Sequence, residues 1–287
     1  MASILDEIFA HKRDEVDRKM LSRGLTEVQA EAEAAPPPLD FIFALHAKAA
    51  QPGFSLPGEV PVRQNAVPAL IAEVKRRSPS RGILAPDFDP VRLAGIYREN
   101  GAAAISVLTD ERFFGGCLEH LSRIAADRPG ESRLQPPLLR KDFISDPYQI
   151  YEARAARADA VLLIAAALPP VLLEALHDLA LELGMAPLVE VHTQDELETA
   201  LNCRPRLVGI NNRDLHDFTT RLETTLHLRP LIPAGITVVA ESGIHSAEDV
   251  ELLAEAGVDA ILVGEALVTA GDVPAKVREL SKGERQS

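Results

Sequence analysis

The 287-residue sequence predicts an α/β fold, a (β/α)8 TIM barrel that carries an N-terminal helical extension. Three observations lead to this prediction. From Pro68 onward, short apolar runs rich in Val, Ile and Leu alternate with amphipathic helical stretches. Eight such runs follow one another over roughly 220 residues, which is typical of eight strand–helix units closed into a barrel. Hydrophobic residues make up 46% of the chain, enough for the core of one large domain.

The eight apolar runs are the predicted barrel strands. Each is short enough for a strand and is followed by turn residues and then by a helical stretch. An open, doubly wound sheet is the competing architecture, but it usually has fewer strands, and no GxGxxG pattern follows the first run. In chain order the runs are 69–75, 103–109, 137–141, 159–165, 186–192, 206–212, 236–242 and 259–265.

The stretches between these runs carry signals for the ends of helices. Asp89-Pro90 and Asp146-Pro147 each place an N-cap residue before a proline at the first helical position. A capping-box pattern begins at Thr193. Gly101 and Gly257 stand where a glycine commonly ends a helix.

Residues 1–60 predict a helical extension of the barrel, and residues 61–287 form the barrel itself, so that the chain is one domain overall. Ile4, Ile8 and Phe9 recur at helical spacing among many charged residues. The extension is too small to build an independent core. Its charges predict a solvated helix face.

Composition limits the classes of function. The formal net charge of −13 disfavours nonspecific nucleic-acid binding, which needs basic surface. Cys117 and Cys203 form no CxxC pattern, which fits a reducing compartment. No signal peptide is visible, and the longest apolar run, 160–173, is too short to span a bilayer. We expect a cytoplasmic monomer or weak homo-oligomer with an anionic small-molecule substrate and no nucleic-acid or membrane partner.

Charged and polar residues stand at the ends of four predicted strands. Side chains on a strand alternate between faces, so Glu73 and Lys75 share the face opposite the apolar residues that pack on helices. The same alternation turns Lys141, Glu190 and Asn211 inward. Glu73 and Lys75 alone would equally suit a structural salt bridge. Five groups at the carboxyl ends of strands favour an active site, because barrel enzymes place their chemistry there.

A phosphate site is predicted after the last two strands. Ser242 and Gly243 follow the seventh run, and Gly264 and Glu265 follow the eighth. The loops after these two strands form the usual phosphate site of such barrels, with backbone N–H groups as donors. The alternative is a pair of ordinary turns. A carboxylate would repel phosphate, so the side chain of Glu265 is expected to turn away and leave only its N–H at the site.

Other kinds of site find no support in the sequence. The eight histidines form no HExxH or clustered ligand pattern, so no metal is expected. No GxSxG motif is present.

Several motifs together resemble the indole-3-glycerol phosphate synthase family. In order along the chain they are IAEVKRRSPSRG, SVLTDERFFGG, LLRKDFISDPYQIYEA, LVEVH, VGINNRDL, VAESGI and LVGEAL. The resemblance covers about residues 68–270, and the charged N-terminal helix also resembles the extra segment of the family. Arg76, Arg77 and Arg81 around the SPS turn, and FFGGC after the second strand, depart from commoner residues. The chain leaves no room for a fused second barrel, so it resembles the monofunctional form.

The resemblance implies a lyase reaction of tryptophan biosynthesis. The substrate would be 1-(2-carboxyphenylamino)-1-deoxyribulose 5-phosphate, which closes a ring and loses carbon dioxide and water to give indole-3-glycerol phosphate. No cofactor is implied. The alternatives are another sugar-phosphate barrel enzyme, such as an isomerase or epimerase, and a non-catalytic barrel that binds a phosphorylated metabolite.

The resemblance also implies the roles of the site residues. Lys141 would be the acid that protonates the ketone oxygen, with Lys75 near enough to lower its pKa by like-charge repulsion. Lys75 would also hold the substrate carboxylate and act as a second acid. Glu190 would perform acid–base work in the dehydration, and Glu73 and Asn211 would orient the substrate.

The remaining predicted residues hold the ends of the substrate. Its anionic groups would meet Arg213 and Ser78. An apolar slot for the benzoate ring is expected from four residues: Phe114, Phe143, Leu162 and Pro79.

Overall fold

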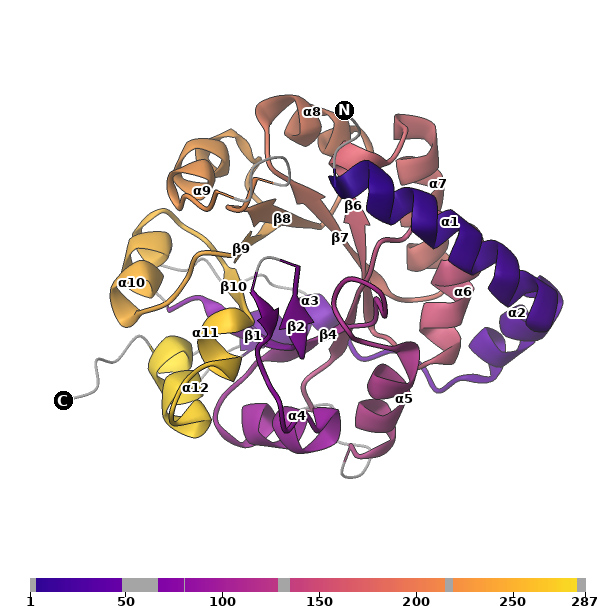
Figure 1. The fold of residues 1–287 in the computed structure, drawn as a ribbon. Coiled ribbons are helices and arrows are strands. Elements are labelled where there is room, and N and C mark those ends of the chain that lie inside the picture. The colour runs from indigo at the N-terminus through magenta and orange to yellow at the C-terminus, as the bar shows by residue number, and fades with distance from the viewer. Residues whose placement is uncertain (1–3, 48–66, 80, 129–134, 215–218, 283–287) are drawn as a thin grey trace.

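A closed barrel of eight parallel strands forms the centre of the molecule (Figure 1). The computed structural model describes residues 4–47, 67–79, 81–128, 135–214 and 219–282. All eight predicted strands are confirmed, each shorter than predicted by one to three residues, and β1 pairs with the last strand, β10, to close the barrel. The strands are β1 (Ala69–Val74), β4 (Ala104–Leu108), β5 (Leu138–Lys141), β6 (Ala160–Ile164), β7 (Ala186–Val191), β8 (Leu207–Asn211), β9 (Thr237–Glu241) and β10 (Ala260–Val263).

Helices surround the barrel and connect its strands (Figure 1). They are α4 (Pro90–Glu99), α5 (Leu118–Ala126), α6 (Pro147–Ala155), α7 (Pro170–Glu182), α8 (Gln194–Asn202), α9 (Glu223–Leu228), α10 (Ala247–Glu255), α11 (Glu265–Val268) and α12 (Val273–Lys282), with 3-10 turns η1 (Ala165–Ala167) and η2 (Arg229–Leu231). The loop after β1 contains a short antiparallel hairpin of β2 (Arg77–Ser78) and β3 (Gly82–Ile83).

The predicted helix starts are capped as the sequence indicates. The carboxylates of Asp89 and Asp146 accept backbone N–H groups at the starts of α4 and α6. At α8 only half of the capping box forms. The Thr193 hydroxyl accepts from the Glu196 N–H, but the Glu196 carboxylate accepts from the N–H of His192, one residue before the cap.

The N-terminal extension packs on both ends of the barrel. Its helices are α1 (Ile4–Ser22), α2 (Leu25–Ala34) and α3 (Phe41–Ala47). In Figure 1, α1 crosses the face of the barrel near β6, α2 continues beside α6, and α3 lies at the opposite end. Phe9, Phe41 and Leu45 belong to the same buried cluster as the barrel strands.

The prediction of a fully solvated charged face on this extension is wrong. Lys12 on α1 has 0% of its surface exposed. Its ammonium lies 3.0 Å from the carboxylates of Asp110 and Asp142, which supply the opposite charge that makes burial of a lysine tolerable.

We propose that the extension and the barrel form one folding unit, since they share one core. The predicted boundary between residues 60 and 61 lies outside the described residues. No helix among the described residues is long and apolar enough to cross a membrane.

Replacing one aromatic residue of α3 tests this unit. Phe41 is 1% exposed, so Phe41→Ala is expected to lower the free energy of unfolding of the whole chain by about 3–5 kcal/mol. Phe43 on the same helix is 54% exposed, and Phe43→Ala is expected to stay within about 0.5 kcal/mol. Denaturant titration followed by circular dichroism measures both. Equal effects of the two substitutions would mean that the extension does not share the core of the barrel.

Candidate active site

A cavity of about 440 Å³ opens at the carboxyl ends of the barrel strands. The sequence-predicted site residues, which come from different strands and loops, all line it. They are Glu73, Lys75, Ser78, Pro79, Phe114, Lys141, Phe143, Leu162, Glu190, Asn211, Arg213, Ser242, Gly243, Gly264 and Glu265. The structure therefore brings these residues together, while their roles in binding and catalysis stay predictions.

Lys141 lies at the centre of the charged half of the cavity. It ends β5, and its Nζ donates to Glu190 at the end of β7 over 2.7 Å and to Glu241 at the end of β9 over 2.8 Å. The amide of Asn211 donates to the other oxygen of Glu190 over 3.2 Å. Both carboxylates are nearly inaccessible to water; the ammonium contacts both, the amide contacts Glu190, and the second oxygen of Glu241 has no hydrogen-bond partner among the described residues.

The pKa of Lys141 is shifted in the direction opposite to the prediction. Burial alone would lower the pKa of this ammonium, but the charges of Glu190, Glu241 and Glu73 outweigh burial and raise it above its ordinary value. Lys75 lies 3.2 Å from Glu73, so its positive charge is paired next to its own strand. The expectation that Lys75 lowers the pKa of Lys141 is therefore wrong for the site without substrate.

The two carboxylates beside Lys141 titrate differently. For Glu190, burial would raise the pKa, but Lys141 and Asn211 outweigh it and the pKa lies below its ordinary value. For Glu241, burial and the charge of Glu190 exceed the lowering effect of Lys141 and raise the pKa to about 8. Two carboxylates that share one ammonium cannot both ionise easily. The opposite shifts of the two pKa values make Glu241 the member of the pair that binds a proton more readily.

Glu241 is the functional candidate that the sequence reading missed. It stands in the quoted VAESGI motif, directly before Ser242. The alternation used for the other strands would have found it, because Thr237, Val239 and Glu241 share one face of β9. At this strand end the sequence prediction named only Ser242 and Gly243, as phosphate ligands.

Two glycines leave room for buried carboxylates. A Cβ on Gly209 would lie 2.2 Å from an oxygen of Glu241, and one on Gly264 would lie 2.1 Å from an oxygen of Glu73. Neither distance is possible for real atoms. Gly264 is thus required by the packing of Glu73, in addition to any role in binding phosphate.

The predicted phosphate loops lie side by side at the cavity wall. Ser242 and Gly243 both adopt positive φ angles, of 68° and 78°, in the turn after β9. Gly264 is the N-cap of α11 after β10.

The prediction that the side chain of Glu265 turns away from the cavity is wrong. Its two oxygens lie 3.0 Å from Arg81 and 3.8 Å from Arg213, both of which also line the cavity. Without substrate, this carboxylate is the anion that the two guanidinium groups attract.

The apolar half of the cavity contains the predicted aromatic residues. The rings of Phe114 and Phe143 have centroids 5.9 Å apart, and Lys75 lies 5.7 Å from the centroid of Phe114. Phe9 of α1 meets Phe143 edge to face at 5.7 Å. A flat ring carrying a carboxylate would find apolar walls and an ammonium in this half.

No group of three or more His, Cys, Asp or Glu side chains is placed to hold a metal ion in the part of the chain that the structure describes. The lysines, carboxylates and amide of the cavity can transfer protons and stabilise charge.

Comparison with known proteins identifies the family. The family model described as indole-3-glycerol phosphate synthase matches residues 5–280. A relative named indole-3-glycerol phosphate synthase from Roseiflexus sp. (strain RS-1) is 53% identical over 287 residues, which cover 99% of this chain and 100% of the relative. A relative of the same name from Dehalococcoides mccartyi (strain ATCC BAA-2266 / KCTC 15142 / 195) is 57% identical over 211 residues, covering 74% and 80%.

Solved structures agree on the fold. The 3-hexulose-6-phosphate synthase from Salmonella typhimurium superposes with a TM-score of 0.60 at 13% identity, covering 75% of this chain and 97% of that one. A likeness at this low identity concerns the barrel alone. The family match over nearly the whole chain is the finding that decides: the chain belongs to the indole-3-glycerol phosphate synthase family.

Proposed function

We propose that this chain catalyses the indole-3-glycerol phosphate synthase reaction in the cavity at the carboxyl ends of its strands, with Lys141 as the central acid. One observation carries this assignment of roles: Lys141 is held between Glu190 and Glu241, next to a slot formed by Phe114 and Phe143. The substrate combines an aromatic carboxylate, a ketone and a phosphate, and the residues that line this cavity suit all three.

Ring closure is the first step. The ring carbon that bears the carboxylate attacks the ketone carbon, a carbon–carbon bond forms, and the ketone oxygen takes a proton from the Lys141 ammonium. The raised pKa of Lys141 keeps it protonated in the resting site. It can still act as an acid, because an alkoxide is a far stronger base than an amine.

Loss of carbon dioxide and of water completes the reaction. Carbon dioxide leaves with its bonding electron pair staying on the ring, which restores aromaticity. Glu190 then assists removal of the hydroxyl as water, taking and returning protons beside Lys141. Asn211 fixes the orientation of Glu190 through its amide.

Proton donation by Lys141 is tested by Lys141→Met. This change keeps the length of the side chain and removes the acid, so kcat is expected to fall by roughly 10²–10⁴-fold. Product is measured by indole fluorescence, and the background is low because the chain contains no Trp. Lys276→Met on α12, outside the cavity, serves as the control. If Lys141→Met is folded and turns over within a few-fold of the unchanged chain, another group is the acid.

The raised pKa of Glu241 leads to a prediction about how kcat/KM depends on pH. Because the pKa of Glu241 is raised to about 8, a second negative charge appears in the site as the pH rises through that value. The substrate is anionic, so kcat/KM is expected to fall there, since its pH profile reports groups of the free enzyme.

Glu241→Gln is neutral at every pH and should abolish this alkaline limb. Glu255→Gln, on the exposed side of α10, should keep it. Initial rates measured from about pH 6 to 10 decide. A limb that persists unchanged in Glu241→Gln belongs to a different group.

Inorganic phosphate tests the predicted phosphate loops. A side chain at Gly264 would strike Glu73, so the more informative change is Glu265→Gln, which removes the carboxylate that occupies Arg81 and Arg213. Phosphate is expected to compete with substrate, and its inhibition constant should fall roughly 3- to 10-fold in Glu265→Gln. An unchanged or larger inhibition constant would mean that the anion binds away from Glu265.

We further propose a cytoplasmic location and a monomer or weak homo-oligomer. Cys117 and Cys203 are both free thiols, the state that a reducing compartment maintains.

A further inference from the structure

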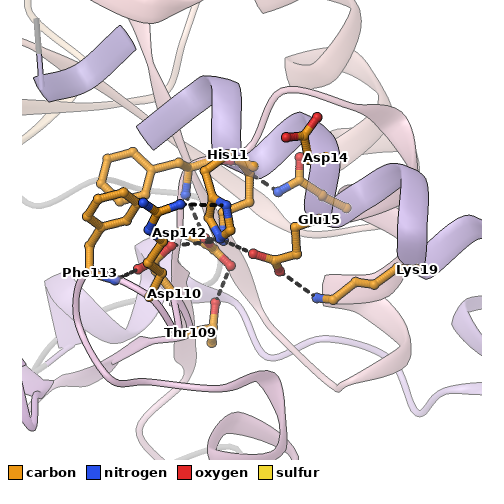
Figure 2. Close-up of polar contacts among 12 residues, drawn as sticks. His11, Asp14, Glu15, Lys19, Thr109, Asp110, Phe113 and Asp142 are labelled. Carbon is orange, nitrogen blue, oxygen red and sulfur yellow. Dashed lines mark hydrogen bonds and ion pairs between the residues drawn. The ribbon is translucent and has the colours of Figure 1, made fainter. Parts of the chain in front are cut away.

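A buried lysine outside the cavity connects two of its walls. Lys12 of α1 has 0% of its surface exposed, and its Nζ lies 3.0 Å from each of Glu15, Asp110 and Asp142. Figure 2 shows Asp110 and Asp142 close to the side chain of Glu15, which projects from α1. Burial would lower the pKa of Lys12, but the carboxylates outweigh burial and raise it, so the group is a permanent cation.

Lys12 belongs to a closed ring of six alternating charges. Each neighbouring pair lies between 2.7 and 3.1 Å apart. The ring joins α1 to β5, to the residue that follows β5, and to α6. Going round, its members are Lys12, Asp142, Arg140, Glu152, Lys19 and Glu15.

The two acids that Lys12 holds from the barrel also hold the aromatic residues of the cavity. An oxygen of Asp110 accepts the backbone N–H of Phe113 over 2.7 Å and that of Phe114 over 3.2 Å. An oxygen of Asp142 accepts the backbone N–H of Phe143 over 2.8 Å. Through these two acids, the ammonium of Lys12 links the loop that carries Phe114 to the loop that carries Phe143.

The two acids depend on Lys12 to different degrees. Asp142 also receives Arg140 and the hydroxyl of Thr109. For Asp110, Lys12 is the cation that the described residues provide, and this carboxylate is 0% exposed. Removal of the ammonium therefore leaves a buried charge that must gain a proton or move toward water. Either change weakens the hydrogen bonds by which Asp110 holds the Phe114 loop.

We propose that Lys12 is a positioning residue of the active site, which sets the separation of Phe114 and Phe143 and thereby the affinity for the aromatic end of the substrate. This inference rests on the proposed function, because it takes these two rings as the benzoate slot. Lys12 itself does not line the cavity. It acts through Asp110 and Asp142.

Lys19 provides a matched comparison on the same helix. Its Nζ also joins two carboxylates, Glu15 at 3.0 Å and Glu152 at 3.1 Å, and so also ties α1 to the barrel. Neither of these acids accepts a backbone N–H from Phe114 or Phe143. A change that merely loosens α1 should therefore affect Lys12 and Lys19 variants alike, whereas a positioning role should affect only Lys12.

The experiment compares Lys12→Met with Lys19→Met by steady-state kinetics on the carboxyphenylamino substrate, at a temperature where melting curves show both to be folded. Lys12→Met is expected to raise KM roughly tenfold or more with kcat within about threefold, because slot affinity is lost while Lys141 stays in place. Lys19→Met should keep KM within about twofold. An equal rise in KM for both would overturn the proposal.

Introducing Lys12→Met into a Phe114→Leu variant tests whether Lys12 acts through the aromatic slot. In Phe114→Leu, the further change Lys12→Met should raise KM by less than about threefold, because coupled residues are not additive. Full additivity would contradict the inference. If Lys12→Met fails to fold, Lys12→Met with Asp110→Asn removes both charges and leaves no buried unpaired acid. That pair of changes should still raise KM, and an unchanged KM would again overturn the proposal.

Failure of the proposed function would look different. In that case neither the unchanged chain nor Lys19→Met would form indole-3-glycerol phosphate from the substrate. The inference would then fail together with the proposed function. Normal turnover of the unchanged chain, together with an unaltered KM in Lys12→Met, would refute the inference alone.

Discussion

The ion pairs of Lys141 with Glu190 and Glu241 are the interaction on which the active site depends. Three charged side chains that leave three different strands must end at the same depth of the barrel. The three side chains do meet, because the ammonium of Lys141 donates to Glu190 over 2.7 Å and to Glu241 over 2.8 Å. Isolated burial of any one of these charges would cost several kcal/mol, so the register of the sheet and the electrostatics of the site support each other.

Charge balance explains how an acidic chain accommodates an anionic substrate. The chain carries a net charge of −13, and the cavity brings Glu73, Glu190 and Glu241 together with only Lys75 and Lys141 at its centre. A proton on Glu241 makes the numbers of positive and negative charges in this group equal. At the rim, the carboxylate of Glu265 occupies two arginines that the phosphate would otherwise meet unopposed. The positive charges of these two arginines are thus available to bind the phosphate of the substrate.

The sequence predicts the barrel and most of the cavity because both follow from local rules. Strand alternation alone turns Glu73, Lys141 and Glu190 to the same interior, and Asp89 caps its helix through neighbouring N–H groups. The buried position of Lys12 does not follow from local rules. Two of its three partners, Asp110 and Asp142, stand far along the chain, and its surroundings in sequence are those of an exposed charged helix, so only the three-dimensional packing shows that it is buried.

The ring of charges around Lys12 also determines when the start of the chain can reach its final place. A chain is synthesised from its N-terminus, so α1 is complete before Arg140 and Glu152 exist. Until α6 has been made, Lys19 of α1 and Arg140 of β5 both lack Glu152, the member of the ring that α6 supplies. The ring of ion pairs that fixes α1 on the barrel can therefore close only after the chain has been made through Glu152.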